Sequence, residues 1–178
     1  MPYAVNGNVL HVNLTTGALE IEHPGADLYR KWGGGSAMGV HYILKHMPAG
    51  ADPLGPDNVL TFFTSPLTAL SISGQSRICA NARSPISGAI GDSQAGGFFP
   101  AQFKFAGFDG LVLRGASPTP VYLYLHDGQA ELRSAAHLWG MTTAETEAAL
   151  VAEMNDPKIE VLQIGPSGEK LSKLAAMM

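Results

Sequence analysis

Residues 110–133 read G-L-V-L-R-G-A-S-P-T-P-V-Y-L-Y-L-H-D-G-Q-A-E-L-R and indicate a fold built largely from short strands. Gly110–Arg114 and Val121–His126 are short, apolar and rich in β-branched or aromatic residues, which is typical of strands. Asp127-Gly128 favours a two-residue turn that leads into another strand over 129–133. We therefore predict a strand followed by a β-hairpin in this part of the chain.

The N-terminal half repeats this pattern. Residues 8–13 alternate apolar and polar side chains, residues 15–17 (T-T-G) supply a turn, and residues 18–22 resume an extended pattern, so a second hairpin is predicted. Residues 59–63 and 77–81 are short apolar segments bounded by Pro, Gly and Ser, which is typical of buried strands. Strands thus outnumber helices along the sequence.

Two segments have helical spacing with clear end signals. In the first, apolar residues recur three and four apart as far as Met47, Ser36 is placed to cap the N-terminus, and Pro48 follows the end. The second begins at T-T-A-E (142–145), a capping box. A further buried strand is predicted over 159–164. Because no fixed repeat or linker divides the chain, we predict one strand-rich α+β domain.

Composition excludes several classes of protein. The 178 residues are 46% hydrophobic and 15% charged, which suits a folded domain. The net charge is −4 and the 11 basic residues are scattered, so nucleic acid is not an expected partner. No apolar run approaches the ~20 residues of a membrane helix. We expect a soluble, cytoplasmic protein without a membrane partner.

Candidate catalytic residues are few, and each has a structural explanation. The single cysteine, Cys79, lies among small apolar residues and is predicted to be a buried hydrophobe. The six histidines lack the spacing of metal ligands, and Ser93 is not in a nucleophile elbow. Asp92 and Asp109 lie next to glycines, where an aspartate commonly stabilises a turn. We predict no catalytic residue within this chain.

The segment S-Q-A-G-G-F-F-P-A-Q-F-K-F-A-G (93–107) places two glycines before a run of helical spacing. Without Cβ atoms, Gly96-Gly97 would let a ligand approach the backbone, and the helix that follows would aim free N–H groups at an anion. Close packing of the helix on a sheet explains the pair nearly as well. Arg77 could add a charge-assisted contact with phosphate, whereas Arg83 is interpreted as a solvated turn residue. Three phenylalanines of the helical run, Phe99, Phe103 and Phe105, are predicted to lie in the core.

Motifs in a fixed order carry a resemblance over nearly the whole chain. They are G-N-V-L-H-V-N-L-T-T-G (7–17), W-G-G-G-S-A-M-G (32–39), D-P-L-G-P-D-N-V-L (52–60), S-P-L-T (65–68), R-S-P-I-S-G (83–88), D-S-Q-A-G-G-F-F (92–99), F-K-F-A-G-F-D-G (103–110), P-V-Y-L-Y (120–124), H-L-W-G (137–140) and I-G-P-S-G-E (164–169). In these stretches the chain resembles the N-terminal domain of the aldehyde ferredoxin oxidoreductase family, the tungsten- or molybdenum-pterin enzymes.

The resemblance implies two β-sheets that form a saddle-like base for a bis-pterin cofactor. It places a pterin-contacting arginine at Arg77 and a loop that contacts pterin at Gln94, Ala95, Gly96 and Gly97. It also implies a magnesium ion that bridges the two pterin phosphates. Some relatives have Asn at position 94 and contribute its backbone carbonyl to this ion. Because the donor is main chain, Gln94 can serve in the same way.

The resemblance further implies that residues 1–178 are a truncated N-terminal domain. A second pterin loop, the 4Fe-4S cluster and most of the catalytic pocket would lie in missing downstream domains, so this fragment alone would be inactive. The parent enzyme would oxidise aldehydes to carboxylic acids and pass electrons to ferredoxin or another electron-transfer protein. Surface that the missing domains would bury could drive homo-oligomer formation.

Two alternative functions stay open. A family member could act on another substrate, for example as a reductase of aromatic-ring thioesters. A different class of protein, a stand-alone phosphate- or nucleotide-binding module without a redox role, would use the same glycine pair.

Overall fold

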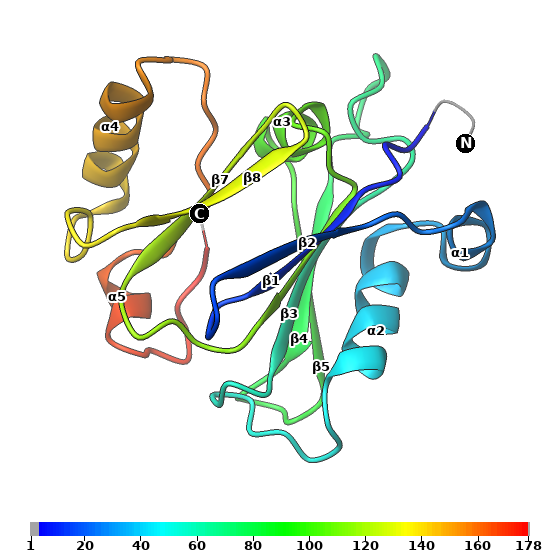
Figure 1. Ribbon diagram of the computed structural model, residues 1–178, viewed down its shortest axis with the longest axis horizontal. Coiled ribbons are helices and arrows are strands. Elements are labelled where there is room, and N and C mark those ends of the chain that lie inside the picture. The colour runs from blue at the N-terminus through cyan, green and yellow to red at the C-terminus, as the bar shows by residue number, and fades with distance from the viewer. Residues whose placement is uncertain (1–3, 178) are drawn as a thin grey trace.

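Strands and helices follow one another along residues 4–177, the part of the chain that the computed structural model describes (Figure 1). The strands are β1 (Val9–Asn13), β2 (Ala18–Glu22), β3 (Val59–Thr64), β4 (Ile78–Arg83), β5 (Ile90–Ala95), β6 (Gly110–Arg114), β7 (Val121–His126) and β8 (Gln129–Ser134). The helices are α1 (Ala26–Trp32), α2 (Gly35–His46), α3 (Phe99–Phe105), α4 (Thr143–Met154) and α5 (Pro166–Glu169). The predicted α+β class with more strands than helices is confirmed.

The strands form two sheets. The larger is six-stranded and mixed, with the order β2-β1-β6-β3-β4-β5, and β7 and β8 form a separate two-stranded sheet. Within residues 4–177, the β1–β6 pair is parallel and the other strand pairs are antiparallel. Both predicted hairpins are confirmed, since Asn13 pairs with Ala18 and His126 pairs with Gln129. The order leaves β2 and β5 as the two edges of the large sheet.

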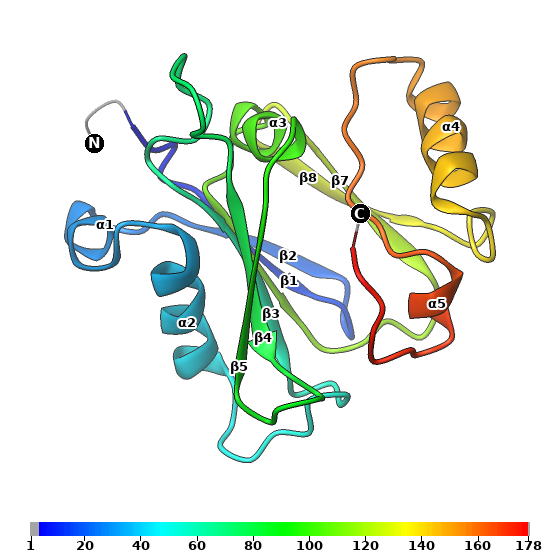
Figure 2. The same ribbon diagram turned by 180° about the vertical axis from the view of Figure 1, so that it is seen from behind.

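Each face of the large sheet packs against a different layer. On one face, Tyr42 of α2 stacks on Phe63 of β3 with ring centroids 5.4 Å apart, inside a fully buried cluster. On the other face, Phe103 of α3 and Phe108 pack with Leu10 and the small sheet. Figures 1 and 2 show the same division, with α1 and α2 on one side of the sheet and β7, β8, α4 and α5 on the other. Removing these side chains from water stabilises the sheet by roughly 1.5–3 kcal/mol for each large apolar residue.

The predicted helix ends are correct, but one predicted cap is wrong. Helix α2 ends at His46, directly before Met47, and α4 begins with the predicted capping box, in which Thr142 and Glu145 bond each other reciprocally. At the start of α2, however, the N-cap residue is Gly34, and Ser36 lies inside the first turn. The Ser36 hydroxyl points out of its own helix and donates to Asp92 of β5. The N-terminus of α2 therefore has no side-chain cap.

One predicted strand is wrong and one strand was missed. Residues 159–164 form no strand and pair only through an isolated bridge between Ile164 and Met177. Their apolar character reflects the packing of Leu162 against the core. Strand β5 was missed because I-G-D-S-Q-A lacks apolar alternation, as an exposed edge strand can.

No helix between residues 4 and 177 is long and apolar enough to cross a membrane.

Candidate functional site

The residues predicted to bind a ligand come together at the β4–β5 edge of the large sheet. Ala95 pairs with Ile78, which places Gly96, the next residue, beside Arg77, the residue before Ile78. Strand β5 pairs only with β4, so its other side is an open edge within the described chain. All five predicted residues are exposed: Arg77, Gln94, Ala95, Gly96 and Gly97.

Gly96 makes room for the Arg77 guanidinium. A Cβ at Gly96 would lie 2.6 Å from Arg77 Nη1, too close for a real contact. That nitrogen donates to the carbonyl of Ser76 at 2.8 Å, the one hydrogen bond of the Arg77 side chain within residues 4–177. The remaining N–H donors of this exposed guanidinium are therefore available to an anion.

Gly97 has a different role, set by its backbone. Its φ of +85° is one that other residues rarely adopt, and a Cβ there would meet nothing within 4 Å. Its carbonyl accepts a 2.6 Å hydrogen bond from the Ser76 hydroxyl. Neither glycine is therefore needed for packing of α3 on the sheet, which was the alternative explanation of the pair. Helix α3 has only seven residues and carries Pro100 in its first turn, so it presents fewer free N–H groups than predicted.

The register of β4 and β5 divides the predicted residues between the two faces of the sheet. Gln94 pairs with Cys79, and both lie on the face covered by α2. Ala95 pairs with Ile78 on the opposite face, which belongs to the α3 cluster. Gln94 and Arg77 are thus on the α2 side, while Ala95 contributes backbone at the edge.

Cys79 and Arg83 are both structural. The Cys79 thiol is buried, as predicted. Its Sγ would lie 3.1 Å from a Cβ at Gly35, so Cys79 packs directly under α2. The interpretation of Arg83 as a solvated turn residue is wrong. Its side chain is half-buried and donates to the carbonyls of Ala51 and Gly88, which ties two loops to the end of β4.

Asp109 is also structural, although not as a turn aspartate. It is 3% exposed and accepts hydrogen bonds from the backbone N–H groups of Asn6 (3.0 Å) and Gly7 (2.6 Å). It accepts a third from the Tyr29 hydroxyl at 3.0 Å. Burial, followed by the nearby Asp109 charge, raises the pKa of Tyr29, so its phenol keeps its proton. Asp109 therefore anchors the N-terminal segment and α1.

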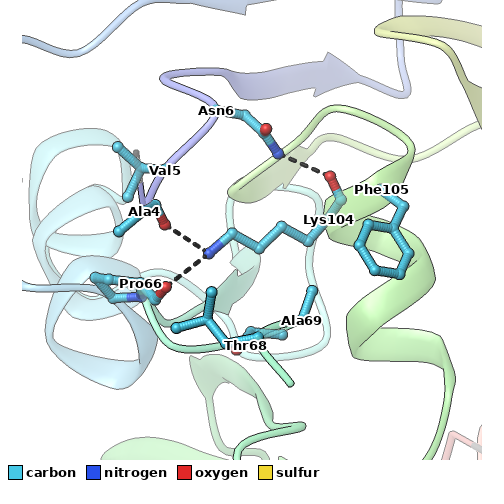
Figure 3. A pocket seen from close by; sticks show the side chains of 9 residues that line it. Ala4, Val5, Asn6, Pro66, Thr68, Ala69, Lys104 and Phe105 are labelled. Carbon is cyan, nitrogen blue, oxygen red and sulfur yellow. Dashed lines mark hydrogen bonds between the residues drawn. The ribbon is translucent and has the colours of Figure 1, made fainter. Parts of the chain in front are cut away.

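A cavity of about 170 Å³ lies beside α3 and contains Lys104 (Figure 3). Lys104 Nζ donates to the carbonyls of Ala4 (2.8 Å), Ser65 (2.7 Å) and Pro66 (3.3 Å). Burial lowers the pKa of this amine. Because all three ammonium donors already have acceptors, Lys104 holds the 65–76 loop and is not available to a ligand.

The three phenylalanines of the helical run differ in burial. Phe103 is 4% exposed and Phe99 packs against the same cluster, so their prediction as core residues is confirmed. Phe105 is 67% exposed and lines the Lys104 cavity, so the prediction is wrong for this residue. Helix α3 therefore packs on the sheet through one side and exposes the other.

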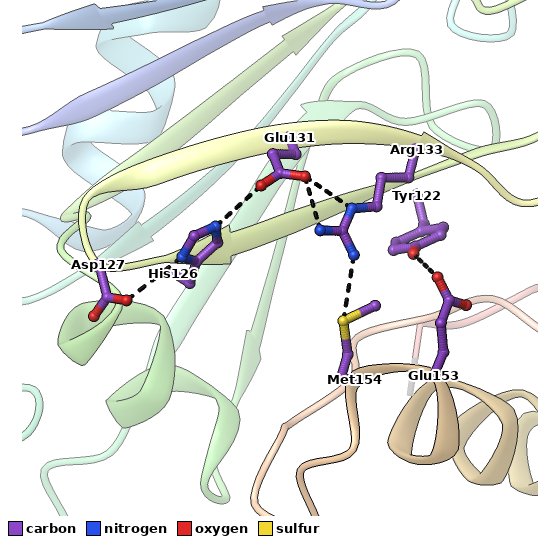
Figure 4. Close-up of polar contacts among 7 residues, drawn as sticks. All are labelled: Tyr122, His126, Asp127, Glu131, Arg133, Glu153 and Met154. Carbon is purple, nitrogen blue, oxygen red and sulfur yellow. Dashed lines mark hydrogen bonds and ion pairs between the residues drawn. The ribbon is translucent and has the colours of Figure 1, made fainter.

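Polar side chains on β7 and β8 form a second cluster (Figure 4). Glu131 bonds His126 at 3.2 Å and Arg133 at 2.8 Å, and these hydrogen bonds lower the pKa of Glu131. Tyr122 donates to Glu153 of α4 at 2.6 Å. The Glu131 pairs lie within the small sheet, and exposed ion pairs of this kind contribute little to stability. The Tyr122–Glu153 hydrogen bond joins the small sheet to α4. Residues 4–177 contain no group of three or more His, Cys, Asp or Glu side chains that could hold a metal ion.

One polar contact near the candidate site joins residues that are far apart in sequence. Asp92 Oδ1 accepts a hydrogen bond from Ser36 Oγ at 2.8 Å and another from Asn81 Nδ2 at 3.0 Å. Asp92 lies within β5 and stabilises no turn of its own, so its earlier interpretation is wrong. Ser36 is 56 residues away in sequence, and no local pattern predicts a contact at that distance.

Comparison with protein families places almost the whole chain in one of them. Residues 9–178 match the model described as "Aldehyde ferredoxin oxidoreductase, N-terminal domain". A tungsten-containing aldehyde ferredoxin oxidoreductase of Thermococcus kodakarensis is 43% identical over 172 residues, which cover 97% of this chain and 28% of the relative. The WOR-like subunit of an aliphatic sulfonate oxidoreductase of Pyrococcus furiosus is 31% identical over 99% of this chain and 30% of its own length.

The fold also matches a solved structure closely. A chain of the active-site complex BamBC of benzoyl coenzyme A reductase, in complex with 1,5-dienoyl-CoA, superposes with a TM-score of 0.96 and 32% identity. The match covers 100% of this chain and 27% of that chain. The chain thus spans little more than a quarter of the length of the proteins that it matches.

Proposed function

The chain belongs to the aldehyde ferredoxin oxidoreductase family, and on this basis we propose that it is the cofactor-binding N-terminal domain of a larger tungsten- or molybdenum-pterin oxidoreductase. The observation that carries the proposal is the exposed Arg77 guanidinium held over Gly96 at an open sheet edge. The Thermococcus relative is tungsten-containing by description, which supports tungsten as the metal. The match over residues 9–178 favours this function over a stand-alone phosphate- or nucleotide-binding module.

The residues at the edge fit a phosphorylated cofactor. Arg77 would pair with a phosphate, because a guanidinium binds phosphate with charge-assisted hydrogen bonds. Gly96 and Gly97 would let the pterin approach bare backbone, with Ala95 continuing the same edge. The backbone carbonyl of Gln94 would bind a magnesium ion, since magnesium prefers oxygen ligands. The bound metal–pterin group would supply the redox chemistry, while this chain would bind and orient it.

The remainder of the parent protein would complete the enzyme. Its downstream domains would hold a 4Fe-4S cluster and the substrate pocket, so this chain alone would be inactive. The parent would be a cytoplasmic enzyme, without a nucleic-acid or membrane partner, that oxidises aldehydes to carboxylic acids and transfers electrons to ferredoxin or a similar protein. Homo-oligomer formation would cover surface that is exposed on the isolated domain.

A second candidate has the same cofactor and a different substrate. The similarity to a chain of the benzoyl coenzyme A reductase complex favours reduction of an aromatic-ring thioester, and the sulfonate oxidoreductase subunit extends the range of substrates within the family. The substrate would be selected by the downstream pocket. Assays of the full-length protein with aldehydes and with aromatic thioesters separate these two candidates.

The test is cofactor content in the full-length protein. Produced with tungstate or molybdate, it should contain bound metal and pterin. Arg77→Ala should lower the pterin content severalfold at an unchanged melting temperature, because the exposed guanidinium contributes a phosphate contact and little to folding. Arg30→Ala, at an exposed position of α1, is the matched control and should keep its pterin. A parent protein without metal and pterin, or an Arg77 variant with normal content, would refute the proposal.

A further inference from the structure

The segment proposed to bind the cofactor lies on the least supported strand of the large sheet. Strand β5 pairs with β4 on one side only, and five of its six residues are exposed. Apart from Ile90, which is 39% exposed, I-G-D-S-Q-A lacks the large apolar side chains that fix the central strands. Hydrogen bonds to β4 alone would leave β5 free to fray at its end, as edge strands do. A cofactor segment must nevertheless keep a fixed position to bind well.

Helix α2 offers a rigid reference point beside this edge. Its N-terminal glycines lie so close to the sheet that a Cβ at Gly34 would lie 2.6 Å from the Thr64 carbonyl. A Cβ at Gly39 would similarly overlap Asn81 and Thr61. Met38, Tyr42 and Ile43 are fully buried against the same face. The helix is therefore held firmly on β3 and β4.

Asp92 links β5 to this rigid layer. Its Oδ1 accepts from Ser36 Oγ of α2 (2.8 Å) and from Asn81 Nδ2 of β4 (3.0 Å). Within residues 4–177, the Ser36 bond is the one hydrogen bond that joins β5 to α2. Asn81 is 1% exposed, so its side chain is itself fixed in the core.

The charge of Asp92 suits this place. The first turn of α2 has no acidic residue and no side-chain cap. A carboxylate at a helix N-terminus is stabilised by the free N–H groups and the positive end of the helix dipole. Asp92 therefore supplies from a neighbouring strand the negative charge that α2 lacks. Hydrogen bonds to a charged acceptor are stronger than those between neutral groups.

Asp92 lies two residues before Gln94, and in a strand residues i and i+2 lie on the same face. We propose that Ser36, Asp92 and Asn81 form a positioning unit that fixes the β5 edge, and with it residues 94–97, against α2 and Arg77. None of the three need contact the cofactor, so they are positioning residues. The inference rests on the proposed function only for the identity of the ligand.

The experiment measures mobility and cofactor content in the full-length protein. Amide hydrogen exchange over residues 90–97 should become about five- to tenfold faster in Asp92→Ala, because two charge-assisted bonds are lost, and pterin content should fall at least twofold. Ser36→Ala removes one bond and should give a smaller change of the same kind. Asp92→Asn keeps an acceptor oxygen and should retain most of the pterin. Ser93→Ala, on the opposite face of β5, is the control and should match the wild type.

The outcomes separate this inference from the proposed function. Unchanged exchange over 90–97 in Asp92→Ala, or equal effects in Ser93→Ala, would overturn the positioning unit. Faster exchange with normal pterin content would also overturn it, since the cofactor would then not depend on the position of β5. A wild-type protein without pterin would refute the proposed function, and the exchange measurements would still test the unit. If Asp92→Ala fails to fold, the test is Ser36→Ala, in which exchange over 90–97 should be faster and pterin content lower than in Ser93→Ala.

Discussion

The two edges of the large sheet, β2 and β5, both expose most of their residues and differ in where their charged side chains lie. Strand β2 carries two glutamates in A-L-E-I-E, and Glu22 bonds His11 at 2.7 Å and approaches Lys45 at 3.7 Å. Charged residues on an edge strand discourage pairing with another chain. Strand β5 has a single charged residue, Asp92, and that charge is directed inward to Ser36 and Asn81.

We call β2 the closed edge, because its charged residues discourage pairing with another chain, and β5 the open edge. At β2 the charges protect the strand, and no residue predicted to bind a ligand lies there. At β5 the backbone ends in Gly96 and Gly97 beside an exposed guanidinium, which is the arrangement expected where a ligand approaches the main chain. The proposed site therefore lies at the edge whose strand carries fewer charged residues.

The largest effect is expected from a change at Gly97. In Gly97→Val, a β-branched residue must adopt a φ of +85°, which costs roughly 1–2 kcal/mol, and its side chain would occupy space that is open in front of the backbone. Both melting temperature and pterin content of the full-length protein should fall.

Gly88→Val provides the matched control for that strain. Gly88 lies in the β4–β5 turn with a φ of +70° and equally open surroundings. Gly88→Val should lower the melting temperature about as much as Gly97→Val does, but it should keep its pterin. If both variants lost pterin equally, the open edge at Gly97 would have no special role.

A smaller and more selective effect is expected at Gly96. In Gly96→Ala the new methyl group would displace the Arg77 guanidinium, a flexible side chain that can move without unfolding the sheet. Pterin content should fall, while the free energy of unfolding should change by no more than about 0.5 kcal/mol. Gly91→Ala, whose Cβ would make only ordinary contacts at 3.5 Å, is the control on the same strand. Equal pterin content in the two variants would contradict the role of Arg77.

The smallest effect is expected at the closed edge and depends on pH. Burial alone would raise the pKa of Glu22, but the His11 hydrogen bond and Lys45 together lower it below the usual 4.5. A carboxyl with a lowered pKa in the folded state stabilises the fold above pH 4.5 and loses this contribution as pH falls through the lower value.

Glu22→Gln should therefore lower the melting temperature near neutral pH, and the difference from wild type should shrink below about pH 4. Pterin content should not change. Glu20→Gln, which changes an exposed glutamate on the same strand, serves as the control. A pH-independent effect of Glu22→Gln would show that the ionised carboxylate contributes nothing to the closed edge.

Local patterns predicted those parts of the fold that depend on neighbours in sequence. The Asp127-Gly128 hairpin, the Thr142 capping box and the end of α2 before Pro48 were all correct, because each depends on a few consecutive residues. The strand predicted over 159–164 was wrong, since apolar residues there had no partner strand. The prediction that Phe105 lies in the core was wrong, because helical spacing alone does not reveal which side of a short helix faces solvent.

The sequence by itself determined the α+β class, the hairpins, the family resemblance and the candidate segment around Gly96-Gly97. Only the tertiary structure decided that Gly96 makes room for the Arg77 guanidinium and that position 97 needs a glycine because of its positive φ. It also decided that Asp92 accepts hydrogen bonds from Ser36 and Asn81. The physical reason is distance along the chain. Turn chemistry and capping act over two to four residues, whereas contacts between β4, β5 and α2 depend on strand order and register, which the complete packed fold sets.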